Sequence, residues 1–560
     1  MAREYVRHVG EQAVQQSPLE QMQLLAAAQL SKGMVTILDP ADIDLGALVL
    51  AKNARVRYDK TSRRSGYSLF SPTAPNSNKI LKLVHFKSIS GQEFLFRITR
   101  NSIHYTDLSA WTAVTATNLI GGDSDRVWAA VGYDTVPQDY RVYFCNNGKN
   151  KIQQIRLTGV GSPLCEDIDT GSASAIAPKA KYVTIFARRV VAAMDPNTAV
   201  GPISMFWSGD ANFKDFDPAQ DVSAGSTPLQ ESPGDRADYI TGVLAFTNVL
   251  VIPREKSIWL ATATQDGSNP FYFYGAVPGI GCNAPYSIAI IPHGMCFVDT
   301  NTGSVWAYSY SYNYGYVAGA NAPERIGLPI EKDLIHNISD PSQIFGSYSD
   351  LNNEYSVCIP IVGTPVVRVW TFNFNNKTWS YMEKNNISEM ADSGNITAVT
   401  SIGGLIGTIA QLQGNINQLS TTKTTSSTQL LGLTDGTIQQ DDSTTDTDAD
   451  GNYTMDIQSK DFVFPDIDTY ASEIRIEYIA HIAGAMTLKY HKWGDPRDES
   501  TWVTAKTITP TRLEEPQLLR YRRNIKARRL RWRLVATKGV FDILSYEVHV
   551  YPGAESHSTR

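Results

Sequence analysis

The hydrophobic residues of this chain come in short runs that turn residues separate, and the stretch from Tyr239 to Tyr308 shows the pattern most clearly. Three apolar runs lie in its first part: Val243–Phe246, Leu250–Ile252 and Ile258–Leu260. Short apolar runs bounded by Gly, Pro and other turn residues are typical of β-strands in a meander. Because the same order recurs from Ser287 to Tyr308, the stretch predicts two consecutive blade-like units.

Similar units recur along much of the chain, at a spacing of roughly 40–60 residues that is typical of propeller blades and other repeat arrays. We expect them near Ile80–Tyr105, Val127–Leu157, Tyr182–Trp207, Tyr239–Leu260, Ser287–Tyr308, Ile344–Trp379 and Ala398–Leu419. A single small sheet cannot cover its own apolar faces, so such units stack on one another. We therefore assign residues 35–450 to a degenerate β-propeller-like domain, whose blade number the pattern leaves open.

The pattern changes after residue 450 to longer strands with strict alternation of apolar and polar residues. The alternating apolar positions are Ile474, Ile476 and Tyr478; Met486, Leu488 and Tyr490; Trp502 and Val503; Leu530, Trp532 and Leu534; Tyr546, Val548 and Val550. Alternation of this kind gives each sheet one buried face, as in a β-sandwich. Residues 451–560 are therefore expected to form a C-terminal β-sandwich.

The N-terminal residues 1–34 have a different pattern. Met22, Leu24, Leu25, Ala28 and Leu30 recur at helical spacing in a Gln-rich segment that Gly33 ends, which predicts a short helical arm. We expect this arm to pack on the chain itself or on a neighbour, and a targeting role is the alternative. The expected fold class is thus all-β, with one helical arm.

Composition narrows the functional classes. The net charge of -6 argues against a protein that coats nucleic acid, although it does not exclude DNA that passes nearby. The five cysteines include no C-x-x-C pair, so neither a disulfide framework nor a zinc ribbon is expected. No apolar run reaches the roughly 18 residues of a membrane-spanning helix, and residues 1–30 lack a signal-peptide pattern. We expect synthesis in the cytosol.

The chain contains no known enzyme signature: no P-loop, no H-E-x-x-H and no G-x-S-x-G. Gly279–Ala284 (GIGCNA) has the letters of a dinucleotide fingerprint, but Pro285 and an apolar strand follow where the fingerprint requires a helix. A turn between blades explains these glycines better. We predict no enzyme activity, no catalytic residue and no cofactor.

Two charged segments are candidate sites. Asp446, Asp448 and Asp450 match the first half of a calcium loop, where carboxylates two residues apart converge on one cation. Ile457 stands where the loop's bidentate Glu should be, and no helices flank the segment, so a solvated acidic loop is the competing interpretation.

The second charged segment holds Arg528, Arg529, Arg531 and Arg533 near the C-terminus. Leu530, Trp532 and Leu534 alternate with these arginines, so the segment predicts a strand with one charged face. On a net-acidic protein such a face favours salt bridges between subunits, and contact with DNA phosphates is the alternative.

Taken as a whole, these motifs resemble a family of bacteriophage virion proteins. The residues that carry the resemblance are Asn53–Arg57 with Arg64–Tyr67, Arg188–Ala193, Ile203–Ser208 with Phe216–Pro218, Ile240–Gly242, Lys256–Trp259, Gly279–Ser287, Asn352–Val357 with Val369–Phe372 and Lys377–Trp379, and Thr437–Gln440 with Lys460–Phe462. The family is that of the tail hub or nozzle proteins of short-tailed phages, also called packaged-DNA-stabilising or tail tubular protein B-like proteins. The resemblance covers residues 45–560.

This resemblance implies a structural virion protein, made in the bacterial cytoplasm, that forms a hexameric ring in the tail below the portal and adaptor. Such a ring retains the packaged genome and conducts DNA during ejection without sequence-specific binding, and its neighbours are adaptor or portal-proximal proteins and tail fibre, spike or needle proteins. On this basis we expect the acidic segment Asp441–Asp450 to lie near the lumen or at a ring interface.

Two other classes stay open. The first is a carbohydrate-binding or carbohydrate-cleaving propeller, either fibre-like or secreted, which requires a pocket of aromatic residues with two suitably spaced carboxylates. The second is a plain scaffold or receptor-binding module.

Overall fold

The structure, a computed structural model, describes residues 23–551 except 58, 72, 90, 109, 117–118, 137, 159–161, 173, 175, 231–237, 247, 293, 310–321, 394–396, 400–421, 425–427, 465–469, 493–494 and 511. The chain divides into two compact units. We call residues 34–37 and 64–453 the propeller unit, and residues 1–33, 38–63 and 454–560 the sandwich unit.

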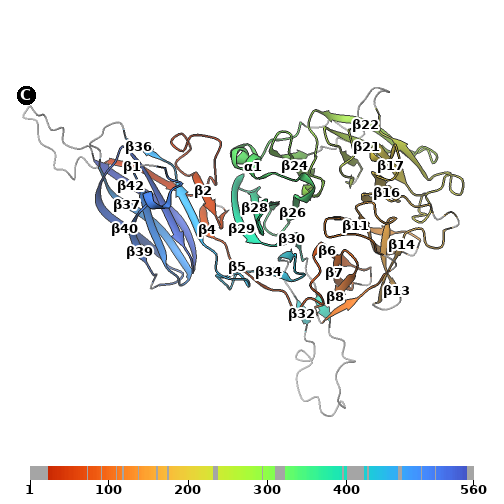
Figure 1. Ribbon diagram of the computed structural model, residues 1–560, viewed down its shortest axis with the longest axis horizontal. Helices are drawn as coiled ribbons and strands as arrows, with labels where there is room; N and C mark the ends of the chain where they lie inside the picture. The colour runs from red at the N-terminus through yellow and green to blue at the C-terminus, as the bar shows by residue number, and fades with distance from the viewer. Residues whose placement is uncertain are drawn as a thin grey trace, which may run out of the picture. The chain divides into compact units, whose positions relative to one another are not determined.

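The described part of the propeller unit contains seven small sheets that follow one another around a ring (Figure 1). The first blade contains β6 (Ile80–Lys87), β7 (Glu93–Thr99), β8 (Ile103–Thr106) and β9 (Trp111–Ala113), and the second contains β11 (Val127–Asp134), β12 (Asp139–Asn146), β13 (Gln153–Thr158) and β14 (Ser162–Asp167), with β10 (Thr115–Ala116) beside β14. The third contains β15 (Tyr182–Phe186), β16 (Arg189–Ala193), β17 (Ser204–Trp207) and β18 (Gly225–Pro228), the fourth β19 (Leu244–Ala245), β20 (Leu250–Pro253), β21 (Ser257–Ala263) and β22 (Phe271–Pro278), and the fifth β23 (Ala289–Ile291), β24 (Gly294–Asp299) and β25 (Ser304–Ser309). The sixth contains β26 (Phe345–Ser349), β27 (Glu354–Pro360), β28 (Val366–Asn373) and β29 (Thr378–Asn385), and the seventh β30 (Ile387–Asp392), β33 (Gln429–Leu433), β34 (Ile438–Asp442) and β5 (Gly66–Leu69). Two short strands, β31 (Thr397–Val399) and β32 (Thr422–Thr424), form a separate ribbon, and α1 (Glu331–Asn337) is the α-helix of the described residues.

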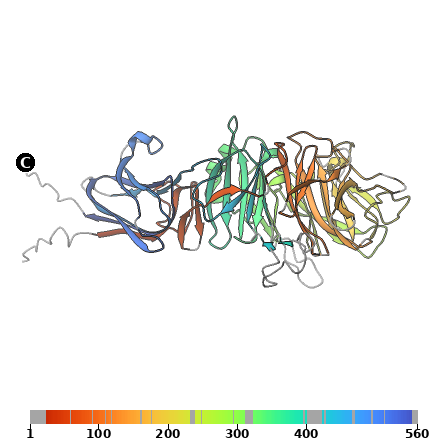
Figure 2. The same ribbon diagram turned by 90° about the horizontal axis from the view of Figure 1, so that it is seen from below.

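The first strand of each blade lies nearest the ring axis, and apolar cores fill the spaces between successive blades. One core joins Phe86 and Phe96 of the first blade to Phe144 of the second, and another joins Leu250 of the fourth to Met205 of the third. Seen at right angles to the first view, the blade strands run from one face of the ring to the other (Figure 2). Burial between blades therefore stabilises the ring, as the apolar runs predict.

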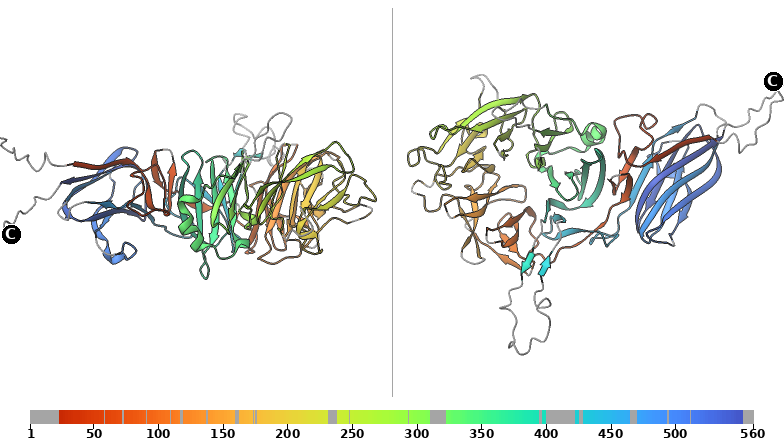
Figure 3. Two further views of the ribbon diagram at one scale, coloured as in Figure 1. Left: turned by 90° about the horizontal axis from the view of Figure 1, so that it is seen from above. Right: turned by 180° about the vertical axis from the view of Figure 1, so that it is seen from behind.

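A strand from the start of the propeller unit closes the ring by pairing with the last blade. β5 (Gly66–Leu69) is added to the last blade and pairs antiparallel with β34, with Tyr67 opposite Asp441 and Leu69 opposite Gln439. The last blade in chain order thus contains the first strand of the unit, so the start and the end of the propeller are held together by main-chain hydrogen bonds. Figure 3 shows the ring of blades from two further directions.

The sandwich unit contains two sets of paired strands. The first set consists, in order across the sheet, of β3 (Ala54–Arg57), β4 (Lys60–Arg63), β42 (Val540–Tyr551), β37 (Tyr470–Ile482) and β40 (Pro516–Lys526), and β1 (Gln23–Gln29) also pairs with β42. The second set consists, in order, of β2 (Leu48–Lys52), β35 (Met455–Ser459), β41 (Arg529–Ala536), β38 (Met486–His491) and β39 (Val503–Ile508), and β36 (Phe462–Val463) also pairs with β41. The ring of Trp532 packs edge-on against Tyr546 with centroids 5.1 Å apart, which joins β41 to β42. The predicted alternation is confirmed here, except that Val503 is exposed.

The all-β class with propeller-like blades is confirmed, but two expectations about the N-terminal region need correction. Residues 23–29 form strand β1 paired to β42, so the helix predicted there is wrong; the rest of that prediction, residues 1–22, lies outside the described residues. Residues 38–63 belong to the sandwich unit, although we assigned 35–450 to the propeller. The seventh expected repeat, Ala398–Leu419, lies almost wholly outside the described residues.

Across the described residues, no helix has the length and hydropathy that crossing a membrane requires.

Candidate functional site

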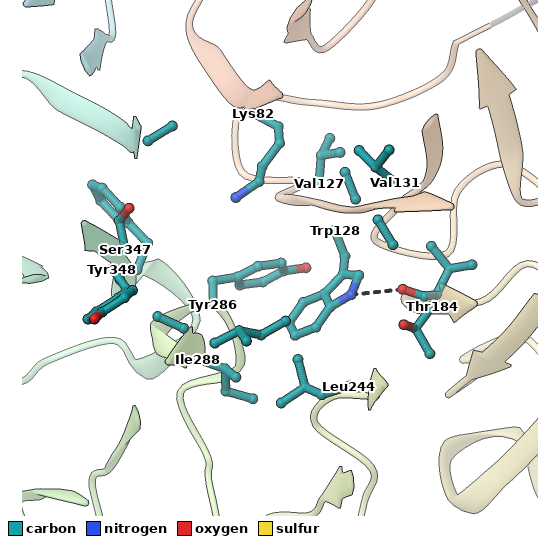
Figure 4. Close-up of a pocket in the computed structure, with 18 of the residues that line it drawn as sticks. Lys82, Val127, Trp128, Val131, Thr184, Leu244, Tyr286, Ile288, Ser347 and Tyr348 are labelled. Atoms are coloured by element: carbon teal, nitrogen blue, oxygen red, sulfur yellow. Dashed lines mark hydrogen bonds between the residues drawn. The ribbon is translucent and has the colours of Figure 1, made fainter. Parts of the chain in front are cut away.

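A cavity of about 500 Å³ lies among the innermost strands of the propeller unit, on the ring axis. The strands β6, β11, β15, β19, β26 and β30 contribute lining residues, and so do Tyr286 and Ile288 before β23. All seven blades therefore contribute to its wall. Figure 4 shows this axial cavity with the side chains that line it. Cavities of about 300–1,000 Å³ are the usual size of small-molecule sites.

Two aromatic side chains cross the axial cavity near its centre. The indole of Trp128 donates a hydrogen bond to the backbone oxygen of Val183 at 3.1 Å, and its ring lies edge-on to Tyr182 at 5.1 Å. The hydroxyl of Tyr286 donates to the backbone oxygen of Arg126 at 3.3 Å. Trp128 also packs against three buried apolar cores, which residues of the second to fifth blades form. These contacts fix both rings in place (Figure 4).

A buried charge cluster lies beside these rings. Lys82 is 2.7 Å from one carboxylate oxygen of Glu389, and Arg126 is 3.7 Å from the other. Arg126 donates to the backbone oxygens of Ser388 and Gln343, and its guanidinium faces the ring of Phe345 at 4.3 Å. Because Glu389 is 4 % exposed, it depends on these two cations for compensation.

The cavity is partly open to solvent. Two residues of its wall, Val131 and Ile290, are 43 % and 53 % exposed, whereas Val127 and Ile288 are 3 % and 9 % exposed. Asp392, at the end of β30, also lines the cavity, and burial raises its pKa to about 6. The cavity thus has an apolar edge, an acidic group of unusual pKa and an aromatic interior, a combination that frequently marks binding sites.

Comparison with models of protein families gives no match to this chain, and comparison with curated protein sequences gives none either.

The structure overturns the calcium-loop interpretation of Asp446, Asp448 and Asp450. Within the described residues, no three His, Cys, Asp or Glu side chains form a group that could hold a metal ion. Asp448 instead receives two hydrogen bonds from Arg64, at 2.8 and 2.6 Å. Lys384 contacts both Asp448, at 3.2 Å, and Asp450, at 2.7 Å.

We call Arg64, Tyr67, Lys384, Asp448, Asp450 and Tyr453 the closure cluster. The side chains of Arg64 and Lys384 are each only 1 % exposed. The guanidinium of Arg64 lies 3.5 Å from the ring centroid of Tyr453, whose hydroxyl donates to the backbone oxygen of Arg64. Burial alone would raise the pKa of Asp448, but the hydrogen bond and charge of Arg64 outweigh it, so this pKa is lowered. The acidic segment thus holds the two ends of the propeller together.

The four C-terminal arginines that we expect at an interface between subunits lie in two different environments. Arg531 is buried and forms a bidentate pair with Asp461, at 2.7 and 3.0 Å. Arg533 pairs with Asp456 at 2.6 Å. Their partners belong to the sandwich unit itself, so neither arginine is available to another subunit. Arg528 and Arg529 are exposed, and Arg529 lies 3.4 Å from Asp461.

A second basic surface lies on strand β40. Arg520, Arg522 and Arg523 are exposed there, and β40 is at the end of its sheet, pairing with β37 alone among the described strands. Arg522 pairs with Glu473 at 3.0 Å, whereas Arg520 and Arg523 have no carboxylate partner in the described part of the chain. Periodicity could have shown this strand, because Leu519 and Ile525 are its buried positions.

The glycines that resemble a dinucleotide fingerprint form a connection between blades, as expected. Gly279 has φ +80° and follows β22 directly, and a Cβ at Gly281 would lie 2.4 Å from the backbone of Glu255. The five cysteines are all buried, and burial raises the pKa of Cys282 to about 12, so its thiol is a poor nucleophile near neutral pH.

Proposed function

We propose that this protein is a structural component of a bacteriophage tail. Copies of the chain form a ring, six-fold as the resemblance implies, that retains and conducts the genome. The observation that carries this proposal is the unequal charge of the two units. The sandwich unit has 25 Lys and Arg against 21 Asp and Glu, whereas the propeller unit has 25 against 35. A chain with one basic and one acidic part suits head-to-tail contact between identical copies.

The basic edge strand β40 is the surface that suits one side of such a contact. Its exposed arginines meet solvent, and its outer edge pairs with no described strand. Natural proteins protect sheet edges with charged residues, and a charged edge can also select a partner of opposite charge. The acidic propeller of the next copy would supply that charge.

The axial cavity of the propeller is a poor route for DNA. Trp128 and Tyr286 lie inside it and are held by hydrogen bonds to the backbone of Val183 and Arg126. The channel of the proposed ring would therefore be the space that several chains enclose. A low affinity for phosphate suits such a channel, because each phosphate contact adds salt-dependent binding that would slow DNA. Portal-adaptor and fibre, spike or needle proteins would be its neighbours in the virion.

The proposal is tested by native mass spectrometry and negative-stain imaging of the purified protein. We expect a closed ring with a central hole that Arg520→Glu/Arg523→Glu disrupts into monomers. The control is Lys256→Glu/Lys332→Glu, which makes the same charge change at exposed positions of the propeller unit. A wild-type chain that stays monomeric at high concentration would overturn the ring, and equal effects of the two double variants would overturn the role of β40.

A second candidate, a carbohydrate-binding propeller, is favoured by the aromatic rings and carboxylates of the axial cavity. Cleavage is less well supported than binding. Glu389 is buried between Lys82 and Arg126, which leaves it unsuited to act as the general acid that glycoside hydrolysis needs. Two results together would favour this candidate: the protein binds a sugar without turning it over, and it does not assemble into rings.

A further inference from the structure

We propose that the axial cavity binds a small, neutral, polyhydroxylated ligand, of the size of one or two sugar rings. The proposal concerns the propeller unit alone and does not rest on ring assembly. It depends on three properties of the cavity: its size, the balance of its charges and the arrangement of its aromatic and hydroxyl groups.

The size of the cavity limits the ligand. The volume of about 500 Å³ lies in the range of small-molecule sites, and a polymer cannot pass where Trp128 and Tyr286 occupy the interior (Figure 4). The exposed wall residues Val131 and Ile290 give the side from which a ligand enters. A single small molecule, or the end of a larger glycan, can therefore be admitted.

The charges of the cavity balance one another. Lys82 and Asp392 line it, Glu389 lies between Lys82 and Arg126, and the four groups together carry two positive and two negative charges when ionised. In this partly buried site, whose charges are balanced, a charged ligand would have no excess opposite charge to compensate its own, which is costly. A neutral ligand avoids this cost and still receives hydrogen bonds from ionised groups, which are stronger than those between neutral groups.

The remaining polar groups are hydroxyls. Thr184 and Ser347 line the cavity from two different sides (Figure 4). The hydroxyl of Tyr348, which also lines it, already donates to the side-chain oxygen of Asn353 at 2.7 Å and can only accept a further hydrogen bond. The hydroxyls of Thr184 and Ser347 can each donate and accept, as the hydroxyls of a sugar do. The rings of Trp128 and Tyr286 offer apolar surface between these groups, and a pyranose has an apolar C–H face to place on such a surface. Backbone groups at the unpaired inner edges of the strands add further donors and acceptors.

The test is saturation-transfer NMR on the full-length protein at pH 7.5. The neutral probes are methyl α-glucopyranoside, methyl β-galactopyranoside, N-acetylglucosamine and maltose, and the charged probes are glucuronate and glucosamine. Two filling variants, Ala130→Phe on β11 and Ser347→Phe on β26, place a ring in the cavity from different blades. Ala219→Phe, on an exposed loop, is the matched control.

We expect at least one neutral probe to receive saturation from the wild-type protein and from Ala219→Phe. Either filling variant that retains the wild-type circular dichroism spectrum should lower that signal at least fivefold. The use of two filling variants protects the test against a failure of one to fold. The proposal is overturned if no neutral probe gives a signal, if a folded filling variant keeps the full signal, or if only charged probes bind.

Discussion

Removing one member of the closure cluster should destabilise the propeller unit far more than removing an exposed ion pair. The perturbations are Arg64→Met and Asp448→Leu, which replace a charged side chain by an apolar one of similar length. Arg64 donates two hydrogen bonds to Asp448, and both side chains are at most 7 % exposed. Deleting one partner of a buried pair typically costs about 3–5 kcal/mol of unfolding free energy.

The structure also orders the two variants. After Arg64→Met, Asp448 still has Lys384 at 3.2 Å, so we expect a loss near the lower end, about 3 kcal/mol. After Asp448→Leu, the buried charge of Arg64 loses its carboxylate and Lys384 keeps only Asp450, so we expect about 5 kcal/mol. The double variant should lose less than the sum, by about 1–3 kcal/mol, because the two residues form one pair.

Equilibrium unfolding in urea, followed by tryptophan fluorescence, measures these differences. The control is Lys377→Met, because Lys377 and Glu324 form an exposed pair at 3.9 Å with side chains 75 % and 68 % exposed. We expect it to cost at most about 1 kcal/mol. Losses below 1 kcal/mol for Asp448→Leu, or losses for Arg64→Met that match the control, would refute the reasoning that the buried pair closes the ring.

Three further outcomes can be checked independently. Gly66→Ala should lower the melting temperature strongly, because its Cβ would lie 2.0 Å from the backbone oxygen of Thr447, whereas Gly267→Ala, with no atom within 4 Å, should not. Burial alone would lower the pKa of His481, but its hydrogen bonds with Asp542 and Glu514 outweigh burial and raise this pKa. The contribution of His481 to stability should therefore be complete below pH 6.5 and fall as the pH rises through the raised pKa. Thermal melts over a pH series should show this fall in the wild type and not in His481→Gln. Burial raises the pKa of Asp392 from 3.8 to about 6, so ionisation of this carboxyl opposes folding. The wild type should therefore lose stability as the pH rises from about 4 to 6, as urea unfolding measures it. Asp392→Asn should not show this loss and should be more stable than the wild type at pH 7.

The blades could be predicted from the sequence because their signal is local. In Leu250–Ile252 and Ile258–Leu260 the apolar runs and the polar turn between them lie within a few residues, and the structure makes them the paired strands β20 and β21. The sandwich strands were predictable for the same reason, since Leu530, Trp532 and Leu534 alternate with exposed or paired side chains.

The sequence-based predictions that are wrong concern residues whose structural partners are distant in sequence. Gln23–Gln29 has a helix-like pattern, but pairing with β42, more than 500 residues later, makes it a strand. The spacing of Asp448 is that of a cation ligand, but in the fold its carboxylate is paired with Arg64 and Lys384. The axial cavity is likewise assembled from single residues of separate blades, and no local spacing of Lys82, Trp128 or Asp392 could reveal it.

The division of the chain has a consequence for its synthesis. The sandwich unit is begun by residues 1–33 and 38–63 and completed only from residue 454 onward, after the propeller unit has been made. At about 5–20 residues per second, a ribosome needs roughly 20–80 s to pass from residue 64 to residue 453. During that time β2 lacks β35, its partner in the sandwich, whereas blades such as β6–β9 and β19–β22 pair strands that are close in sequence and can form as soon as they are made. The nascent chain should therefore fold from its middle outward, and its first strands must avoid aggregation until its last strands emerge.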